Sequence, residues 1–144
     1  MRKQKMKKIL SLLAAGVLLL MSMSGCGKEA ETGKTQVAMI VKSTESAFFK
    51  SVFAGARAAA TEYNLNVTFN GPESEEDYVT QSEMVRQAME DGVDVIVFSA
   101  VDYNANAEII GQAAQRGIKI VVIDSDVNSS MVSCRIGTNN LQAG

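Results

Sequence analysis

The stretch from Ile118 to Asp124 limits the possible folds of this chain most strongly. Apart from Lys119, residues 118–123 are all isoleucine or valine. No polar residue alternates with them, so we expect both faces of this segment to be covered, as in a strand inside a parallel sheet. The chain is therefore predicted to be an α/β protein built on a parallel sheet.

The apolar run ends on a carboxylate, Asp124. In open α/β sheets, ligands bind in the crevice outside the carboxyl ends of the strands. We therefore interpret Asp124 as the polar tip of a buried strand, facing a ligand crevice. The alternative is a solvated acid or a helix cap just beyond a core strand, since acidic side chains are mostly exposed.

Composition excludes several classes of function. The chain has 144 residues and contains no histidine, which excludes Ser-His-Asp and Cys-His catalysis and every histidine-ligated metal site. Five basic residues precede residue 9, and the rest of the chain has 9 basic and 16 acidic residues. So acidic a body is a poor binder of nucleic acid, because phosphate contact needs clustered lysine and arginine.

The N-terminus has the pattern of a secretory signal peptide. A basic start is followed by residues 9–21, in which only Ser11 is polar, and this run is too short to span a bilayer. Small residues at 22–25 then precede Cys26, an ending that resembles a bacterial lipobox. We predict that 1–25 is a lipoprotein signal peptide and that Cys26 is lipidated, which would anchor the chain to the outer face of the cell membrane. The alternative is an ordinary signal peptide with an incidental cysteine.

Residues 26–35 are small, polar and charged, so they are interpreted as a flexible tether before a folded body at 36–144. The only other cysteine is Cys134. If Cys26 is acylated, Cys134 has no partner in the chain, and we expect it to be a buried small hydrophobic residue.

Strand and helix signals alternate along the body. An apolar stripe at helical spacing runs from Phe49 to Tyr63, and Asn64 is a candidate left-handed cap. Two further helices are expected, one beginning near Ser74 and one near Tyr103. The expected strands lie at 37–41, 66–69, 93–98, 118–123 and 131–136. This order predicts a doubly wound, mostly parallel sheet with strand order 2-1-3-4-5.

In that topology the ends of the first, third and fourth strands converge on one crevice. They carry residues 43–48, 99–102 and 124–126. Neither a Gly-x-Gly-x-x-Gly sequence nor a nucleoside-triphosphate loop follows the first strand, and no nucleophile elbow is present. The crevice is therefore predicted to bind a ligand without a catalytic constellation, cofactor or metal.

Five short motifs occur in order along the body. They are Ser46-Ala47-Phe48-Phe49, 92–97, 99–102, 121–125 and 136–140. Together they resemble the type I periplasmic sugar-binding proteins, the ribose-, galactose- and xylose-like solute receptors of ABC transporters, continuously from Gln36 to Gly144. The resemblance implies a receptor whose two lobes close on one sugar, of which this chain holds the N-terminal lobe as a truncated form. It also implies an ABC permease as partner.

The resemblance and the residue chemistry together suggest which side chains contact the sugar. A carboxylate such as Asp124 accepts sugar hydroxyls in charge-assisted hydrogen bonds. Phe48 lies off the helical core stripe and suits stacking on a sugar ring, although a place in the peripheral core is the alternative. Phe49 lies on the helical core stripe, so it is either a residue of the hydrophobic core or a residue that lines the sugar site. The complete set of predicted ligand-binding residues is Ser46, Phe48, Phe49, Asp102, Asp124 and Ser125.

Two of these residues have a second interpretation. Ser46 either donates a hydroxyl to the ligand or caps the following helix, and Asp102 is either a helix N-cap or a ligand contact. For the whole chain, the leading hypothesis is extracytoplasmic sugar binding for an ABC importer. The alternative is an extracellular sugar-sensing domain that feeds a two-component kinase or a chemoreceptor.

Overall fold

The computed structural model describes residues 33–143, which form a five-stranded parallel sheet with the order β2-β1-β3-β4-β5. The predicted fold class and strand order are confirmed. The predicted signal peptide, Cys26 and most of the predicted tether lie outside the described residues. The strands are β1 (Gln36–Ile40), β2 (Asn66–Asn70), β3 (Val95–Phe98), β4 (Lys119–Ile123) and β5 (Cys134–Ile136). The helices are α2 (Ala47–Glu62), α3 (Tyr78–Glu90), α4 (Ala107–Gln115) and α5 (Asn140–Ala143).

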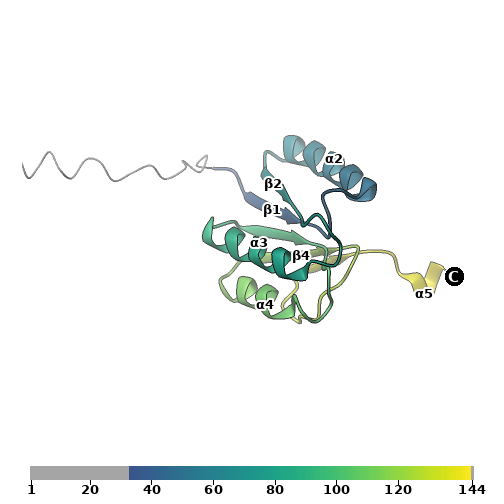
Figure 1. Cartoon of the computed structure of the whole chain (residues 1–144). Coiled ribbons are helices and arrows are strands. Elements are labelled where there is room, and N and C mark those ends of the chain that lie inside the picture. Colours follow the sequence, from purple (N-terminus) through teal and green to yellow (C-terminus); the bar gives the residue numbers. More distant parts are fainter. Residues whose placement is uncertain (1–32, 144) are drawn as a thin grey trace, which may run out of the picture. The chain divides into compact units, whose positions relative to one another are not determined.

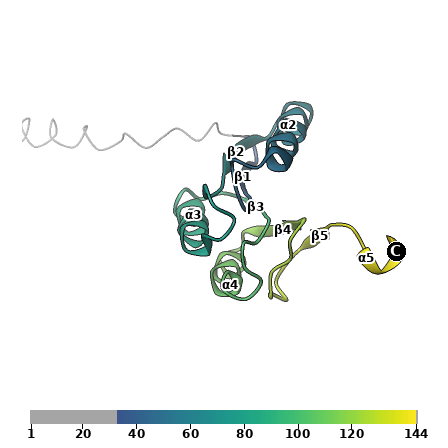
Figure 2. The same cartoon turned by 45° about the vertical axis from the view of Figure 1, so that its right-hand side comes forward.

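The helices cover the two faces of the sheet unequally. Helix α2 lies on one face, over β1 and β2, whereas α3 and α4 lie together on the other face (Figures 1 and 2). Such a division follows from right-handed crossovers that leave the central strand in opposite directions. None of the described helices is long and apolar enough to cross a membrane.

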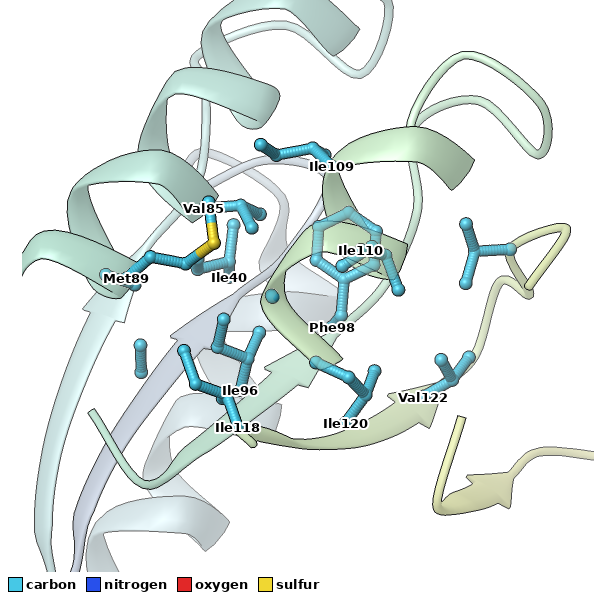
Figure 3. Packing of buried hydrophobic residues seen from close by; sticks show 14 of the residues in the cluster. Ile40, Val85, Met89, Ile96, Phe98, Ile109, Ile110, Ile118, Ile120 and Val122 are labelled. Atoms are coloured by element: carbon cyan, nitrogen blue, oxygen red, sulfur yellow. The ribbon is translucent and has the colours of Figure 1, made fainter. Parts of the chain in front are cut away.

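Two hydrophobic clusters fill the space between the sheet and its helices. The larger cluster joins α3 and α4 to the sheet through fully buried residues such as Ile40, Ile96 and Ile120 (Figure 3). The smaller cluster lies under α2 and contains Phe49 and Phe53. Burial of this much apolar surface is the main favourable term in folding, so these clusters fix the sheet that carries the crevice.

Left-handed residues end the helices as the sequence predicts. Asn64, Gly92 and Gly117 have φ angles of 53°, 70° and 88°, and each follows a helix. Glycine and asparagine tolerate this conformation better than other residues, so they stop a helix at a defined position.

The starts of two helices differ from the prediction. Helix α3 begins at Tyr78, not near Ser74, because the Asp77 carboxylate accepts a hydrogen bond from the Thr80 N–H and acts as the N-cap. Helix α4 begins at Ala107, not near Tyr103, because the Asp102 carboxylate forms a tight turn with the backbone just after it. Local side-chain bonds of this kind compete with helix formation.

Burial at the β4–β5 side of the sheet is also lower than predicted. Ile120 and Val122 of β4 are buried, but Val121 and Ile123 on its other face are only half-buried. All of β5 is exposed, including Cys134, so the prediction of a buried cysteine is wrong. The reason is that Cys134 lies on the edge strand of the described sheet, and α2 covers only the β1–β2 side of that face.

Candidate functional site

Asp124 stands at the carboxyl end of β4 in an unusual backbone conformation. Its φ angle is 57°, in the left-handed region that aspartate tolerates better than most residues. Its N–H donates to the carbonyl oxygen of Ile136 at 3.1 Å, which ties the turn to β5. The chain therefore changes direction at Asp124 and presents the carboxylate at the rim of the sheet.

Three donors from three neighbouring strand ends meet on one oxygen of this carboxylate. Asp124 Oδ2 lies 3.2 Å from Lys42 Nζ and accepts hydrogen bonds from Ser99 Oγ at 3.3 Å and Ser125 Oγ at 3.1 Å. Lys42 follows β1, Ser99 follows β3, and Ser125 follows Asp124 itself. The ends of the first, third and fourth strands thus converge as expected, although Lys42 lies just before the residues 43–48 that were expected to contribute.

Lys42 is the part of this arrangement that the sequence did not reveal. Its side chain is only 22% exposed, and its ammonium group lies 5.9 Å from the centre of the Phe49 ring. A cation at that distance over an aromatic face is attracted to the ring as well as to the carboxylate. The carboxylate at the rim of the sheet therefore has a cation beside it, and each of the two groups has a second contact.

Phe48 and Asp124 line the same cavity. This cavity has a volume of about 520 Å³, within the range of about 300–1,000 Å³ of small-molecule sites. The remaining lining residues are apolar or small: Val52, Ile123, Ile136, Gly137 and Thr138. The lining thus combines aromatic and aliphatic side chains with one carboxylate and one hydroxyl.

The two phenylalanines of the first strand–helix junction have different positions. Phe48 is 56% exposed and lines the cavity, whereas Phe49 is 1% exposed and belongs to the core under α2. Their rings are 5.0 Å apart in an edge-to-face arrangement, so Phe49 supports Phe48 from below. Of the two rings, only that of Phe48 lines the cavity.

The other predicted ligand-binding residues lie at the same edge of the sheet but outside this cavity. Ser46 occupies the N-cap position of α2, and its side chain makes no capping hydrogen bond there. Ser125 contacts Asp124 as described. Asp102 accepts hydrogen bonds from the N–H groups of Ala105 at 2.7 Å and Asn104 at 2.8 Å, and these bonds lower the pKa of its carboxyl group.

A second cavity, of about 560 Å³, adjoins the first and shares Asp124 with it. Its wall carries an ion pair in which Arg135 Nε lies 2.8 Å from Asp126 Oδ1, and Arg135 also donates to the carbonyl oxygen of Ser129. Both charged side chains are about half exposed, so this pair adds little to stability. The Arg135–Asp126 ion pair is therefore a second pair of opposite charges at this edge of the sheet.

The arrangement suits recognition of a neutral, hydroxyl-rich molecule. Among the residues that line the cavity, Asp124 accepts hydrogen bonds, Thr138 can donate one, and Phe48 is apolar, while Lys42 lies beside Asp124 without lining the cavity. Within residues 33–143 there is no group of three or more histidine, cysteine, aspartate or glutamate side chains that could hold a metal ion. The cavity therefore resembles small-molecule sites in which a few polar groups orient a ligand against an apolar wall.

Comparison with known proteins agrees with this geometry. A family model described as a periplasmic binding protein domain matches residues 37–144. No curated protein is a significant match to the chain.

Three solved structures illustrate the similarity. A sugar transporter from Clostridium phytofermentans is 33% identical with a TM-score of 0.73, and the match covers 76% of this chain and 41% of that one. A carbohydrate transporter solute-binding protein from Agrobacterium radiobacter, in complex with D-arabinose, is 28% identical with a TM-score of 0.74, covering 77% and 37%. An ABC transporter solute-binding protein from Agrobacterium vitis, with bound D-fucose, is 30% identical with a TM-score of 0.70, covering 75% and 39%. The matched part of the chain thus corresponds to 37% to 41% of the length of these structures.

Proposed function

Since the chain belongs to the periplasmic binding protein family, we propose that its crevice binds a monosaccharide outside the cytoplasm for an ABC importer. Family members of this kind are solute-binding proteins, and solved relatives carry D-arabinose or D-fucose. The proposal extends sugar binding from those relatives to this chain. It assigns to the chain binding without chemical turnover, and an ABC permease as the partner that receives the sugar.

The observation that supports the proposal most directly is the shared cavity of Phe48 and Asp124. A sugar presents an apolar ring face and hydroxyl groups at its edge. The Phe48 ring would stack on the ring face, as aromatic side chains do with flat apolar surfaces. Because Lys42, Ser99 and Ser125 all engage Oδ2 of Asp124, a sugar hydroxyl would donate to Oδ1.

Lys42 adds a donor next to that acceptor. Its ammonium group has three N–H bonds, and one is directed to Asp124. A remaining N–H can donate to the oxygen of a neighbouring hydroxyl on the same sugar. In this proposal, two adjacent hydroxyls are therefore recognised by Oδ1 of Asp124 as acceptor and by Lys42 Nζ as donor, which lies 3.2 Å from the other carboxylate oxygen, Oδ2.

Protein-observed NMR tests the proposal without requiring tight binding. ¹⁵N-labelled protein is titrated with D-arabinose, D-fucose and a panel of other pentoses and hexoses, and the dissociation constants are taken from the shift changes. We expect saturable shifts for at least one sugar, which is recovered unchanged afterwards. Absence of saturable shifts for the whole panel, or chemical conversion of the sugar, would refute the proposal.

The place of binding is a further part of the proposal and depends on the N-terminal sequence. We propose that lipid on Cys26 holds the protein at the outer face of the cell membrane. The basic start, the short apolar run and the small residues before Cys26 support this. Mass spectrometry of the protein expressed in bacteria should find a diacylglyceryl group on Cys26 and loss of residues 1–25. A free thiol at Cys26 in mature, membrane-associated protein would contradict lipid anchoring.

A further inference from the structure

Gln81 is a fully buried polar residue near the start of α3. Its side chain is 0% exposed and lies on the same helix face as Val85, Ala88 and Met89, which belong to the larger hydrophobic cluster. Burial of an amide among apolar groups is unfavourable unless its hydrogen bonds are satisfied. Something other than hydrophobic packing therefore accounts for glutamine at this position.

The amide of Gln81 makes three hydrogen bonds to the backbone at the crevice end of the sheet. Nε2 donates to the carbonyl oxygens of Val41 and Ser99, each at 2.9 Å, and Oε1 accepts from the N–H of Val101 at 2.9 Å. The partners fix the orientation of the amide, because the flipped form would place its oxygen against two carbonyl oxygens. Both N–H groups and the oxygen of the amide are satisfied.

These partners lie where the β1–β3 ladder ends. The last ladder-like bond runs from the Ser99 N–H to the carbonyl oxygen of Ile40, at 3.1 Å. Beyond it the two segments diverge, since β1 leads to α2 on one face and β3 leads to α4 on the other (Figure 2). Val41 and Ser99 are both 0% exposed, so their carbonyl groups need a partner inside the protein. The Gln81 amide supplies it to both.

Ser99 itself and the residue after Val41 carry groups that contact Asp124. Lys42 directly follows Val41, and Ser99 donates its own hydroxyl to Asp124 Oδ2. We infer that Gln81 is a positioning residue, which sets the spacing of the β1 and β3 ends and thereby aims Lys42 and Ser99 at Asp124. This inference assigns Gln81 a part in sugar recognition and in that respect rests on the proposed function. Gln81 itself does not contact the cavity.

The first test removes the hydrogen bonds of Gln81 while keeping the volume of its side chain. In Gln81→Met all three backbone partners lose their bond, whereas Met89→Ala, two turns further along the same buried face, removes packing only. The ligand is D-arabinose or D-fucose, whichever sugar the wild type binds. We expect its dissociation constant to rise about tenfold in Gln81→Met, which is about the effect of losing one charge-assisted hydrogen bond between the sugar and the site. Met89→Ala should leave it within about twofold, because Met89 packs in the hydrophobic cluster and makes none of the hydrogen bonds to the ends of β1 and β3. Equal weakening in both folded variants would overturn the inference.

A second variant keeps the test decisive if Gln81→Met does not fold. In Gln81→Glu a carboxyl oxygen still accepts from Val101, but the ionised group has no donor for the two carbonyl oxygens. When protonated, it regains one donor. Burial and the facing carbonyl groups raise the pKa of such a glutamate, so the donor is present at low pH and is lost as pH rises through that pKa.

The ratio of variant to wild-type dissociation constants should therefore increase with pH. Other acids close to this region, such as Asp77 and Asp102, are present in both proteins and cancel in the ratio. A role in packing alone predicts a ratio that does not change with pH, and that result would overturn the inference.

The crystal structure of Gln81→Glu at high pH separates this inference from the proposed function. We expect Lys42 Nζ and Ser99 Oγ to move away from their positions 3.2 Å and 3.3 Å from Asp124 Oδ2. This measurement needs no ligand, so it stands even if the wild type binds none of the sugars tested. Unchanged distances to Asp124 would show that Gln81 does not position these groups.

Discussion

Asp124→Asn isolates the charge of the central carboxylate. Asparagine has nearly the same shape and, like aspartate, tolerates the left-handed φ of 57° found at this position. The substitution therefore leaves the backbone turn in place. It removes the negative charge that Lys42, Ser99 and Ser125 contact and that the sugar hydroxyl would share.

The structure sets the expected size of the effect on binding. Three protein donors already occupy Oδ2, so one charge-assisted hydrogen bond to a sugar hydroxyl, at Oδ1, is at stake. Such a bond contributes about 1.5–3 kcal/mol, against about 0.5–1.5 kcal/mol for the neutral bond that asparagine can still make. The midpoints of these two ranges differ by about 1.25 kcal/mol, which corresponds to a roughly eightfold higher dissociation constant.

The expected effect on folding is small. The side chains of Lys42 and Asp124 are 22% and 37% exposed, and partly solvated pairs of this kind contribute less than about 1 kcal/mol. Urea unfolding should therefore show a free energy of unfolding within about 1 kcal/mol of wild type. Loss of affinity without loss of stability is the combination that identifies a ligand contact.

Asp94→Asn is the matched control. Asp94 accepts the N–H of Gln36 at 2.7 Å at the opposite, amino-terminal end of the sheet, and its substitution changes the net charge equally. NMR titrations of both variants with the same sugar give the comparison. An unchanged dissociation constant in folded Asp124→Asn, or the same loss in Asp94→Asn, would refute the assignment of Asp124.

Other substitutions and conditions probe neighbouring parts of the site. Phe48→Ala should weaken sugar binding with little change in stability, because Phe48 is 56% exposed, whereas Phe49→Ala should lower the free energy of unfolding by about 3–5 kcal/mol because Phe49 is buried; urea unfolding and NMR titration distinguish the two. Gly71→Ala should destabilise by about 1–3 kcal/mol, since its new methyl group would meet the carbonyl oxygen of Val41 at 2.9 Å; unchanged thermal unfolding would contradict this close approach. The lowered pKa of Asp102 in the folded protein means that its contribution is present above the unfolded pKa of about 3.9 and is lost as pH falls through the folded value. Stability measured between pH 5 and pH 2 (roughly the span over which carboxylates protonate) should therefore fall less steeply in Asp102→Asn, and equal slopes would argue against the turn.

The sheet could be predicted because its signals are local and repeated. The strands β1, β3 and β4 are short, mainly apolar runs, the helices α2, α3 and α4 are each followed by a left-handed residue such as Asn64 or Gly117, and right-handed crossovers leave few possible orders. The position of Asp124 followed from the same logic, as a carboxylate directly after a buried strand.

The polar contacts could not be predicted because they depend on tertiary position. On α3 the aromatic residue Tyr78 is 44% exposed, whereas the polar residue Gln81 is fully buried. A search for apolar spacing passes over a buried glutamine whose partners are backbone groups of other strands. Lys42 was missed for a similar reason, since its partner Asp124 is 82 positions away and belongs to a different strand end.

The exposure of the β5 side chains could not be predicted from the sequence pattern either. Cys134 and Ile136 have the residue types of a buried strand, but each is exposed at the edge of the described sheet. Residue type alone reports a tendency to be buried, whereas burial depends on which helix covers that part of the sheet.

A crystal structure of the protein with a monosaccharide bound, at a sugar concentration well above the dissociation constant found by NMR, tests the central claim most directly. We predict density for the sugar ring against the face of Phe48, with one hydroxyl donating to Asp124 Oδ1 and a neighbouring hydroxyl accepting from Lys42 Nζ. A sugar bound at the amino-terminal edge of the sheet, or bound without contact to Asp124, would contradict it.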